Sequence, residues 1–143
     1  MDSTVFADTS FFIARVWPRD PHRAQAEAWE RLLADHGARI VTTEAVLWEF
    51  LNAFAGRQTR RLAIEAYHAI HSDGSIRVVG FESPQLAAAL RLYASREDKD
   101  WSVVDCLSFV VMAAELLTGA LTADHHFEQA GYSALLLHPP SEP

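Results

Sequence analysis

Short β-prone segments alternate with longer helical segments along this chain, and this alternation restricts the fold more than any other feature of the sequence. The segments that favour strands are STVFA (3–7), RIVTT (39–43), IRVVGF (76–81), ALTA (120–123) and SALLL (133–137). Between them, apolar residues recur at helical spacing, as in HRAQAEAWERLLADHG (22–37). Strands and helices that alternate in this way form a parallel sheet covered on both faces. We therefore predict a three-layer α/β/α domain with a central parallel sheet of four to five strands.

Capping and stop residues predict the bounds of two helices that matter for function. Thr42 or Thr43 can cap a helix over residues 44–55. A second helix is predicted over residues 102–118, with Gly119 marking its end. In folds of this class the ligand binds beyond the carboxyl ends of the strands, at the edge where the helices that follow them begin.

Length and composition favour a single globular domain. The 143 residues suit one hydrophobic core, and we expect residues 1–138 to form the domain and residues 139–143 to be a frayed tail. The longest apolar runs are too short to span a bilayer, and the N-terminus lacks the basic segment of a signal peptide, so we expect a cytoplasmic protein. The single cysteine, Cys106, lies in an apolar run and is expected to be a buried, reduced thiol.

The net charge of −7 argues against indiscriminate electrostatic binding of nucleic acid. It leaves room for a local basic surface. Two sets of arginines could form one, although arginines grouped in this way are usually solvated surface. The sets are Arg57, Arg60 and Arg61, and Arg15, Arg19 and Arg23.

Four acidic residues are expected at one edge of the predicted sheet. Asp8 follows the first strand, and Asp124 follows the strand at 120–123. Asp105 lies in the first turn of its predicted helix and Glu49 in the second turn of its own. Four carboxylates that share a cleft would raise one another's pKa values unless a divalent cation supplied the opposite charge. Oxygen ligands without thiolates suit Mg²⁺ or Mn²⁺.

Each of these acids also has a simpler explanation. Asp105, three residues after Ser102, fits a capping box. Asp8 could bond the backbone of its own turn, and Asp124 could cap the helical turn that follows it. Glu49 could point to solvent. Capping and metal binding are compatible roles for one carboxylate, so these alternatives stay open.

The motifs ADTSFFIA, VLWEFLNA, DKDWSVVDCLSF and LTADHHF, in this order, resemble those of the PIN domain family, and most closely the VapC-type toxins of prokaryotic toxin–antitoxin pairs. The resemblance runs from about residue 5 to residue 137. It implies a PIN-like α/β/α fold and a Mg²⁺-dependent endoribonuclease, with Mn²⁺ as a possible substitute. It also implies that the acidic site of the family corresponds to Asp8, Glu49, Asp105 and Asp124.

The resemblance suggests roles for the four acids in hydrolysis of RNA phosphodiester bonds. Asp8 and Asp105 are expected to be the direct metal ligands. Glu49 is expected to position the attacking water, and Asp124 to bind a second ion or to hold water in the site. These roles place all four acids in the catalytic machinery.

The same resemblance implies protein partners. A toxin of this type pairs with a cognate antitoxin that lays an apolar segment across it, and homodimerisation is also expected. Phe11, Phe12, Trp17, Trp48 and Phe54 could form the antitoxin surface, unless they belong to the core. No contact with a membrane is expected.

Other functions fit the sequence less well. A phosphatase of the haloacid dehalogenase type needs an acid two residues after Asp8, where this chain has Ser10, and a receiver domain needs a lysine near its last strand, whereas the only lysine is Lys99. Zinc binding by His125 and His126 together is disfavoured, because adjacent helical residues point about 100° apart. A PIN-like module that binds RNA or protein without cutting remains an alternative.

Overall fold

The computed structural model describes residues 3–140 of the chain. Its strands are β1 (Thr4–Ala7), β2 (Arg39–Thr43), β3 (Ile76–Val79), β4 (Gly119–Leu121) and β5 (Ser133–Ala134). Its α-helices are α1 (Thr9–Val16), α2 (Arg23–Asp35), α3 (Glu44–Ala53), α4 (Arg60–Ser72), α5 (Gln85–Ser95), α6 (Val103–Ala114) and α7 (His125–Gln129). A short 3₁₀ helix, η1 (Leu135–Leu137), follows β5.

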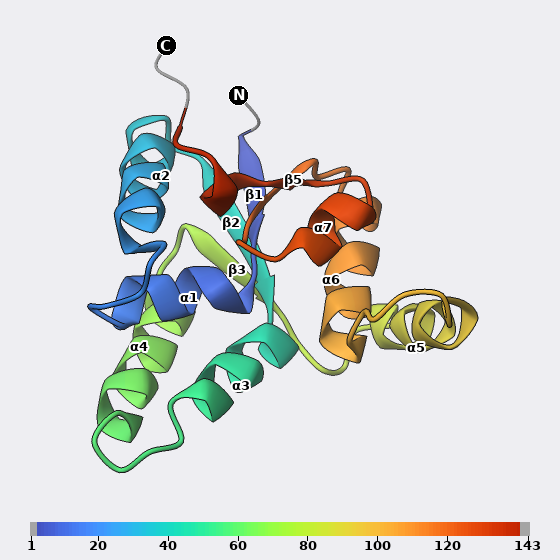
Figure 1. Cartoon of the computed structure of the whole chain (residues 1–143), viewed down its shortest axis with the longest axis horizontal. Helices are drawn as coiled ribbons and strands as arrows, with labels where there is room; N and C mark the ends of the chain where they lie inside the picture. The colour runs from blue at the N-terminus through green and yellow to red at the C-terminus, as the bar shows by residue number, and fades with distance from the viewer. Residues whose placement is uncertain (1–2, 141–143) are drawn as a thin grey trace.

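The five strands form one parallel sheet in the order β3-β2-β1-β4-β5. In Figure 1, α1 to α4 lie to one side of the strands and α5 to α7 to the other. Within the first group α1 packs against α2 and α3, and within the second α6 packs against α5 and α7. The predicted α/β/α architecture with a parallel sheet is therefore confirmed.

The order of the strands creates a switch point between β1 and β4. From β1 the chain continues to β2 and β3 on one side, and it later adds β4 and β5 on the other side. The helix after β1 belongs to one layer, whereas the helix after β4 belongs to the opposite layer (Figure 1). At such a point the loops after the two strands diverge and leave a crevice at the carboxyl edge of the sheet.

The two strands at the switch point are buried on both faces. Their most buried side chains are Val5, Phe6, Ala7, Ala120 and Leu121, each no more than 4% exposed. Continuous apolar burial is typical of the central strands of parallel sheets. The polar residues that follow, Asp8 and Thr122, are therefore placed by rigid strands and not by loops.

The aromatic residues considered for a partner surface divide into two groups. Phe11, Phe12 and Phe54 are at most 5% exposed and belong to the core. Trp17 and Trp48 are 41% and 57% exposed. The alternative that they belong to the core therefore holds for the three phenylalanines, and Phe12 packs against Phe50 of α3, which also contacts Phe54.

Helix α6 ends earlier than the sequence predicts. It stops at Ala114 and not near residue 118, and Leu116 adopts the left-handed conformation at φ 57°. The backbone N–H of Leu117 donates to the carbonyl of Met112 at 2.9 Å, which closes the helix end. Gly119 does not end the helix and is instead the first residue of β4. A Cβ at this position would lie 3.3 Å from the Leu135 side chain, so glycine allows the close packing there.

The C-terminal region also differs from the prediction. Only Ser133 and Ala134 of the segment 133–137 pair with the sheet, and the three leucines that follow form η1. The predicted tail begins at residue 139, and its residues 141–143 lie outside the described part of the chain. Among the described residues, no helix has both the length and the apolar character needed to cross a membrane.

The cluster of aromatic side chains between α1 and α3 predicts where a substitution in the core destabilises the fold most. Phe50 is fully buried and packs against Phe12 and Phe54, with ring centroids 6.2 and 5.1 Å apart. We expect Phe50→Ala to lower the free energy of unfolding by about 3–5 kcal/mol, measured by urea denaturation. Leu90→Ala, where the side chain is 59% exposed, is the control and should cost less than about 1 kcal/mol. Equal losses in the two variants would contradict this assignment of the core.

Candidate active site

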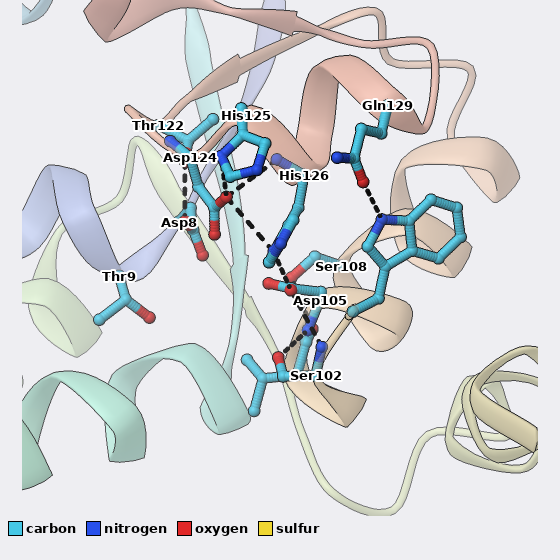
Figure 2. A network of polar contacts seen from close by, with 12 residues as sticks. Asp8, Thr9, Ser102, Asp105, Ser108, Thr122, Asp124, His125, His126 and Gln129 are labelled. Carbon is cyan, nitrogen blue, oxygen red and sulfur yellow. Dashed lines mark hydrogen bonds and ion pairs between the residues drawn. The ribbon is translucent and has the colours of Figure 1, made fainter. Parts of the chain in front are cut away.

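The polar residues that follow β1 and β4 are joined by hydrogen bonds. Asp8 is the N-cap residue of α1, and the Thr122 hydroxyl donates to its Oδ2 at 2.8 Å. Ser10 Oγ lies 3.2 Å from Thr122 Oγ1 and accepts a hydrogen bond from the Ala123 backbone N–H at 3.0 Å. These contacts bind the start of α1 to the segment after β4, so the Asp8 carboxylate has a defined position at the carboxyl edge of the sheet, beside Thr122 (Figure 2).

The Asp8 carboxylate is buried, and within residues 3–140 it has no ion pair with a basic side chain. Its residue is 5% exposed, and burial raises the pKa of this carboxyl to about 7. The Thr122 hydrogen bond lowers the pKa, whereas the negative charges of Asp105 and Glu49 raise it further. Asp105 and Glu49 are therefore close enough to Asp8 to influence its ionisation, as the predicted gathering of acids requires.

Asp105 is held from two sides. Its Oδ2 accepts a hydrogen bond from the Ser102 backbone N–H at 3.1 Å, and the Ser102 hydroxyl accepts one from the Asp105 N–H, which completes a capping box. His126 Nδ1 lies 3.1 Å from the same Oδ2. Burial raises the Asp105 pKa, the Ser102 N–H lowers it, and the charge of Asp124 raises it. Across residues 3–140, Oδ1 of Asp105 has no hydrogen-bond partner in the chain, so this oxygen remains available to a ligand.

Asp124 combines a capping role with a place in the site. Its Oδ1 accepts a hydrogen bond from the His126 backbone N–H at 2.9 Å and lies 3.4 Å from His126 Nδ1. Ligand atoms of Asp105, Asp124 and His126 all lie within 4.8 Å of one another, which is close enough for one metal ion. Figure 2 shows the His126 ring between the two carboxylates.

Glu49 approaches the same crevice from α3. Its Oε1 accepts a hydrogen bond from the hydroxyl of Thr9, the residue next to Asp8, at 2.5 Å. Glu49 is half-buried and not directed wholly to solvent. The structure therefore brings the four predicted acids to one edge of the sheet, from α1, α3, α6 and α7.

Three residues of the site were not predicted from the sequence: Thr9, Thr122 and His126. Thr122 could have been found, because a threonine at the carboxyl end of a buried strand points its hydroxyl toward the neighbouring strand end. His126 carried a weaker signal, since either histidine of the pair could have turned inward. The structure distinguishes them, because the His125 side chain is 69% exposed and that of His126 is 21% exposed.

The two arginine sets do not neutralise this site. Arg15 and Arg23 pair with Glu27, and Arg15 also with Glu30, so this set is part of the contact between α1 and α2. In the other set, Arg61 pairs with Glu65 on the surface of α4. Within residues 3–140, the ion pairs of Asp105 and Asp124 involve histidines alone.

The side chains present fit a divalent cation. They offer carboxylate oxygens and one imidazole nitrogen, while the nearby Cys106 is fully buried. Carboxylate ligands suit hard cations such as Mg²⁺ and Mn²⁺. An Asp8 carboxylate that is ionised only above about pH 7 in the free protein would be stabilised in its charged form by such an ion.

Comparison with known proteins gives a consistent result. A family model described as the PIN domain matches residues 5–131. The crystal structure of Mycobacterium tuberculosis VapC20, a Sarcin-Ricin loop cleaving toxin, is 27% identical and superposes with a TM-score of 0.79 over 91% of this chain and 97% of that chain. VapBC2 from Rickettsia felis, bound to a DNA fragment from its promoter, is 14% identical, with a TM-score of 0.66 over 91% and 96% of the two chains, and shows similarity of fold alone. No curated protein sequence matches the chain.

The raised pKa of Asp8 predicts how stability depends on pH. Unfolded Asp8 ionises near pH 4, whereas the folded carboxyl does so at about 7, so the folded protein binds more protons between these values and its free energy of unfolding falls as the pH rises. In metal-free buffer at about pH 8, Asp8→Asn should therefore be more stable than the natural chain by about 1–4 kcal/mol.

Denaturation in EDTA at about pH 5 and about pH 8 measures this effect, and the advantage of Asp8→Asn should shrink at the lower pH. Asp35→Asn, at the exposed end of α2, should show no such dependence. An Asp8→Asn variant that is less stable than the natural chain at both pH values would show that burial of the ionised Asp8 carboxylate does not destabilise the folded protein.

Proposed function

The chain belongs to the PIN domain family, and from this membership and the site geometry we propose that it is a divalent-cation-dependent endoribonuclease, the toxin of a toxin–antitoxin pair. The observation that carries the proposal is the meeting of Asp8, Asp105, Asp124 and Glu49 at the switch point of the sheet, with no arginine or lysine to neutralise them within residues 3–140. The similarity to the VapC20 toxin supports the same class of activity.

Asp8 and Asp105 are the proposed metal ligands, and Mg²⁺ is the proposed ion, with Mn²⁺ as a substitute. Both carboxylates are oriented by hydrogen bonds within the chain, Asp8 by Thr122 and Asp105 by Ser102. A bound divalent cation would neutralise charge that develops on the phosphate and make water a stronger nucleophile. Orientation of the carboxylates before the substrate arrives lowers the reorganisation that the reaction needs.

Glu49 is proposed to orient the attacking water and to accept its proton. The Thr9 hydroxyl occupies one of its oxygens, which holds the carboxylate toward Asp8. Asp124 is held near Asp105 by its contacts with His126. In-line attack on a phosphodiester needs the water and the leaving group on opposite sides of the phosphorus, and Asp124 is proposed to bind a second ion or to hold water in the site.

RNA is the proposed substrate, and its recognition is proposed to involve Arg57, in the segment before α4, and Arg60 and Arg61, at the start of α4. All three are exposed, and within residues 3–140 the one ion pair of this set joins Arg61 to Glu65 on the solvent-facing side of α4. Phosphate contacts of this kind position a nucleic acid without reading its sequence. The Sarcin-Ricin loop, which the VapC20 toxin cleaves, is the first RNA to test.

A cognate antitoxin is the proposed protein partner. A groove of about 740 Å³ lies between α1, α2 and α4. Core side chains that are at most 3% exposed, Phe11, Phe12 and Leu33, border it, and its more accessible apolar lining includes the half-buried Val16, Ala66 and Ile70. Trp17 lies at the end of α1 and is 41% exposed, which extends this apolar surface. An apolar helix or extended segment of an antitoxin fits a groove of this composition.

Substitution of the metal ligands tests the proposed activity. Asp8→Asn and Asp105→Asn should each reduce Mg²⁺-dependent cleavage by about 100-fold or more, because an amide lacks the charge that binds the ion. Asparagine retains a carbonyl oxygen that can accept the hydrogen bond from Thr122 or Ser102, so circular dichroism should show an unchanged fold. Asp35→Asn is the control, because this residue lies at the end of α2, away from the site.

Cleavage of the Sarcin-Ricin loop and of an unstructured RNA should be followed with Mg²⁺, with Mn²⁺ and with EDTA. The proposal expects cleavage that EDTA abolishes. RNA binding without cleavage in either ion would identify the chain as a non-catalytic PIN-like module. Activity that persists in both asparagine variants would refute the assignment of the ligands.

Assembly is tested separately. We propose a cytoplasmic homodimer that binds its antitoxin through the groove. Size-exclusion chromatography with light scattering should give the mass of a dimer for the chain alone and a heavier complex with the product of a neighbouring antitoxin gene. Ala66→Glu, in the groove, should prevent the heavier complex and leave the chain's own mass unchanged. Formation of the complex by this variant would exclude the groove as the antitoxin site.

A further inference from the structure

We propose that His126 is a nitrogen ligand of the cation site, together with Asp105 and Asp124, and that it makes the site prefer transition-metal ions such as Mn²⁺ over Mg²⁺. This inference rests on the proposed metal dependence of the chain. It goes further because it assigns a second ligand type, an imidazole nitrogen, and a metal preference that carboxylates alone would not produce.

The spacing of the three side chains matches a single coordination sphere. His126 Nδ1 lies 3.1 Å from Asp105 Oδ2 and 3.4 Å from Asp124 Oδ1. Two ligand atoms that each lie about 2.1 Å from one ion, at the angles of octahedral or tetrahedral geometry, are about 3.0–3.4 Å apart. The imidazole therefore already has the spacing of a ligand toward each carboxylate, and the three ligand atoms, one from each residue, lie within 4.8 Å of one another.

The imidazole is not needed to build the helix ends near it. The Ser102 backbone N–H and hydroxyl complete the capping box of α6 with Asp105. The cap of α7 uses the backbone N–H of His126 and not its ring. The ring nevertheless turns into the space between two carboxylates, while the adjacent His125 ring is left largely in solvent (Figure 2).

A nitrogen ligand changes which ion binds best. Mg²⁺ prefers oxygen ligands and gains little from imidazole, whereas affinity for transition-metal ions rises when imidazole replaces a water or carbonyl ligand. A site formed by carboxylates and one imidazole should therefore favour Mn²⁺ over Mg²⁺ more strongly than a site formed by carboxylates alone. This preference is a property of binding and can be measured without RNA.

Two substitutions separate a ligand from a residue that only orients Asp105. Asparagine places an amide N–H near the position of Nδ1, so His126→Asn can keep the hydrogen bond to Asp105 Oδ2 but lacks the imidazole nitrogen. His126→Ala removes both. His125→Asn is the matched control, because it removes the neighbouring, exposed imidazole from the same turn.

Calorimetric titration of the metal-free full chain with MnCl₂ and with MgCl₂ gives the ratio of the two dissociation constants. We expect the preference for Mn²⁺ to fall about tenfold in both His126→Asn and His126→Ala, and to stay unchanged in His125→Asn. Circular dichroism in EDTA should show that all three variants keep the fold of the natural chain.

Three results would overturn the proposal. Retention of the preference by His126→Asn would show that the histidine acts through its hydrogen bond alone. Tighter binding of both ions by His126→Ala would show that the imidazole competes with the cation. Both of these results leave the proposed nuclease intact. The third result is failure of the natural chain to bind either ion, which would remove the metal dependence of the proposed function as well.

Discussion

The site depends on one buried carboxylate at the centre of the sheet. Asp8 follows β1, a buried strand, and the Thr122 hydroxyl beyond the end of neighbouring β4 holds it in place. A carboxyl group that loses water in this way resists ionisation, and the acids around it strengthen the effect. In the free protein the ionised form of Asp8 is therefore destabilised, and a divalent cation can offset this destabilisation. The contacts that bury the carboxylate also define where the ion would bind.

Capping and ligation are roles of the same side chains here. Asp105 closes the start of α6, and Asp124 closes the start of α7, yet both also face His126 and the crevice. A carboxylate has enough acceptor capacity for both tasks, because each oxygen has two lone pairs. The capping bond restricts rotation of the side chain, and a ligand that is already oriented loses less entropy when an ion or a substrate binds.

Sequence patterns predicted the architecture and the acids, and they were least reliable where packing chooses between equivalent conformations. The end of α6 moved to Ala114 because a left-handed Leu116 could make the turn, which left Gly119 for close contact with Leu135. The sequence left open whether five aromatic residues belong to the core or to a partner surface, and three phenylalanines lie in the core while Trp17 and Trp48 remain exposed. Periodicity alone decides neither point, because the end of α6 depends on how its last turn closes and the burial of the rings depends on which faces of α1 and α3 meet.

The order of apolar and polar residues along the chain was sufficient to determine the parallel sheet and the edge at which Asp8, Glu49, Asp105 and Asp124 lie. Local periodicity and the ends of strands carry that information directly. Only the tertiary structure decided that Thr122 binds Asp8, that Thr9 holds Glu49 and that His126, rather than His125, enters the site. Those contacts join residues up to 114 positions apart, and their geometry depends on side-chain directions that are set when the helices pack on the sheet.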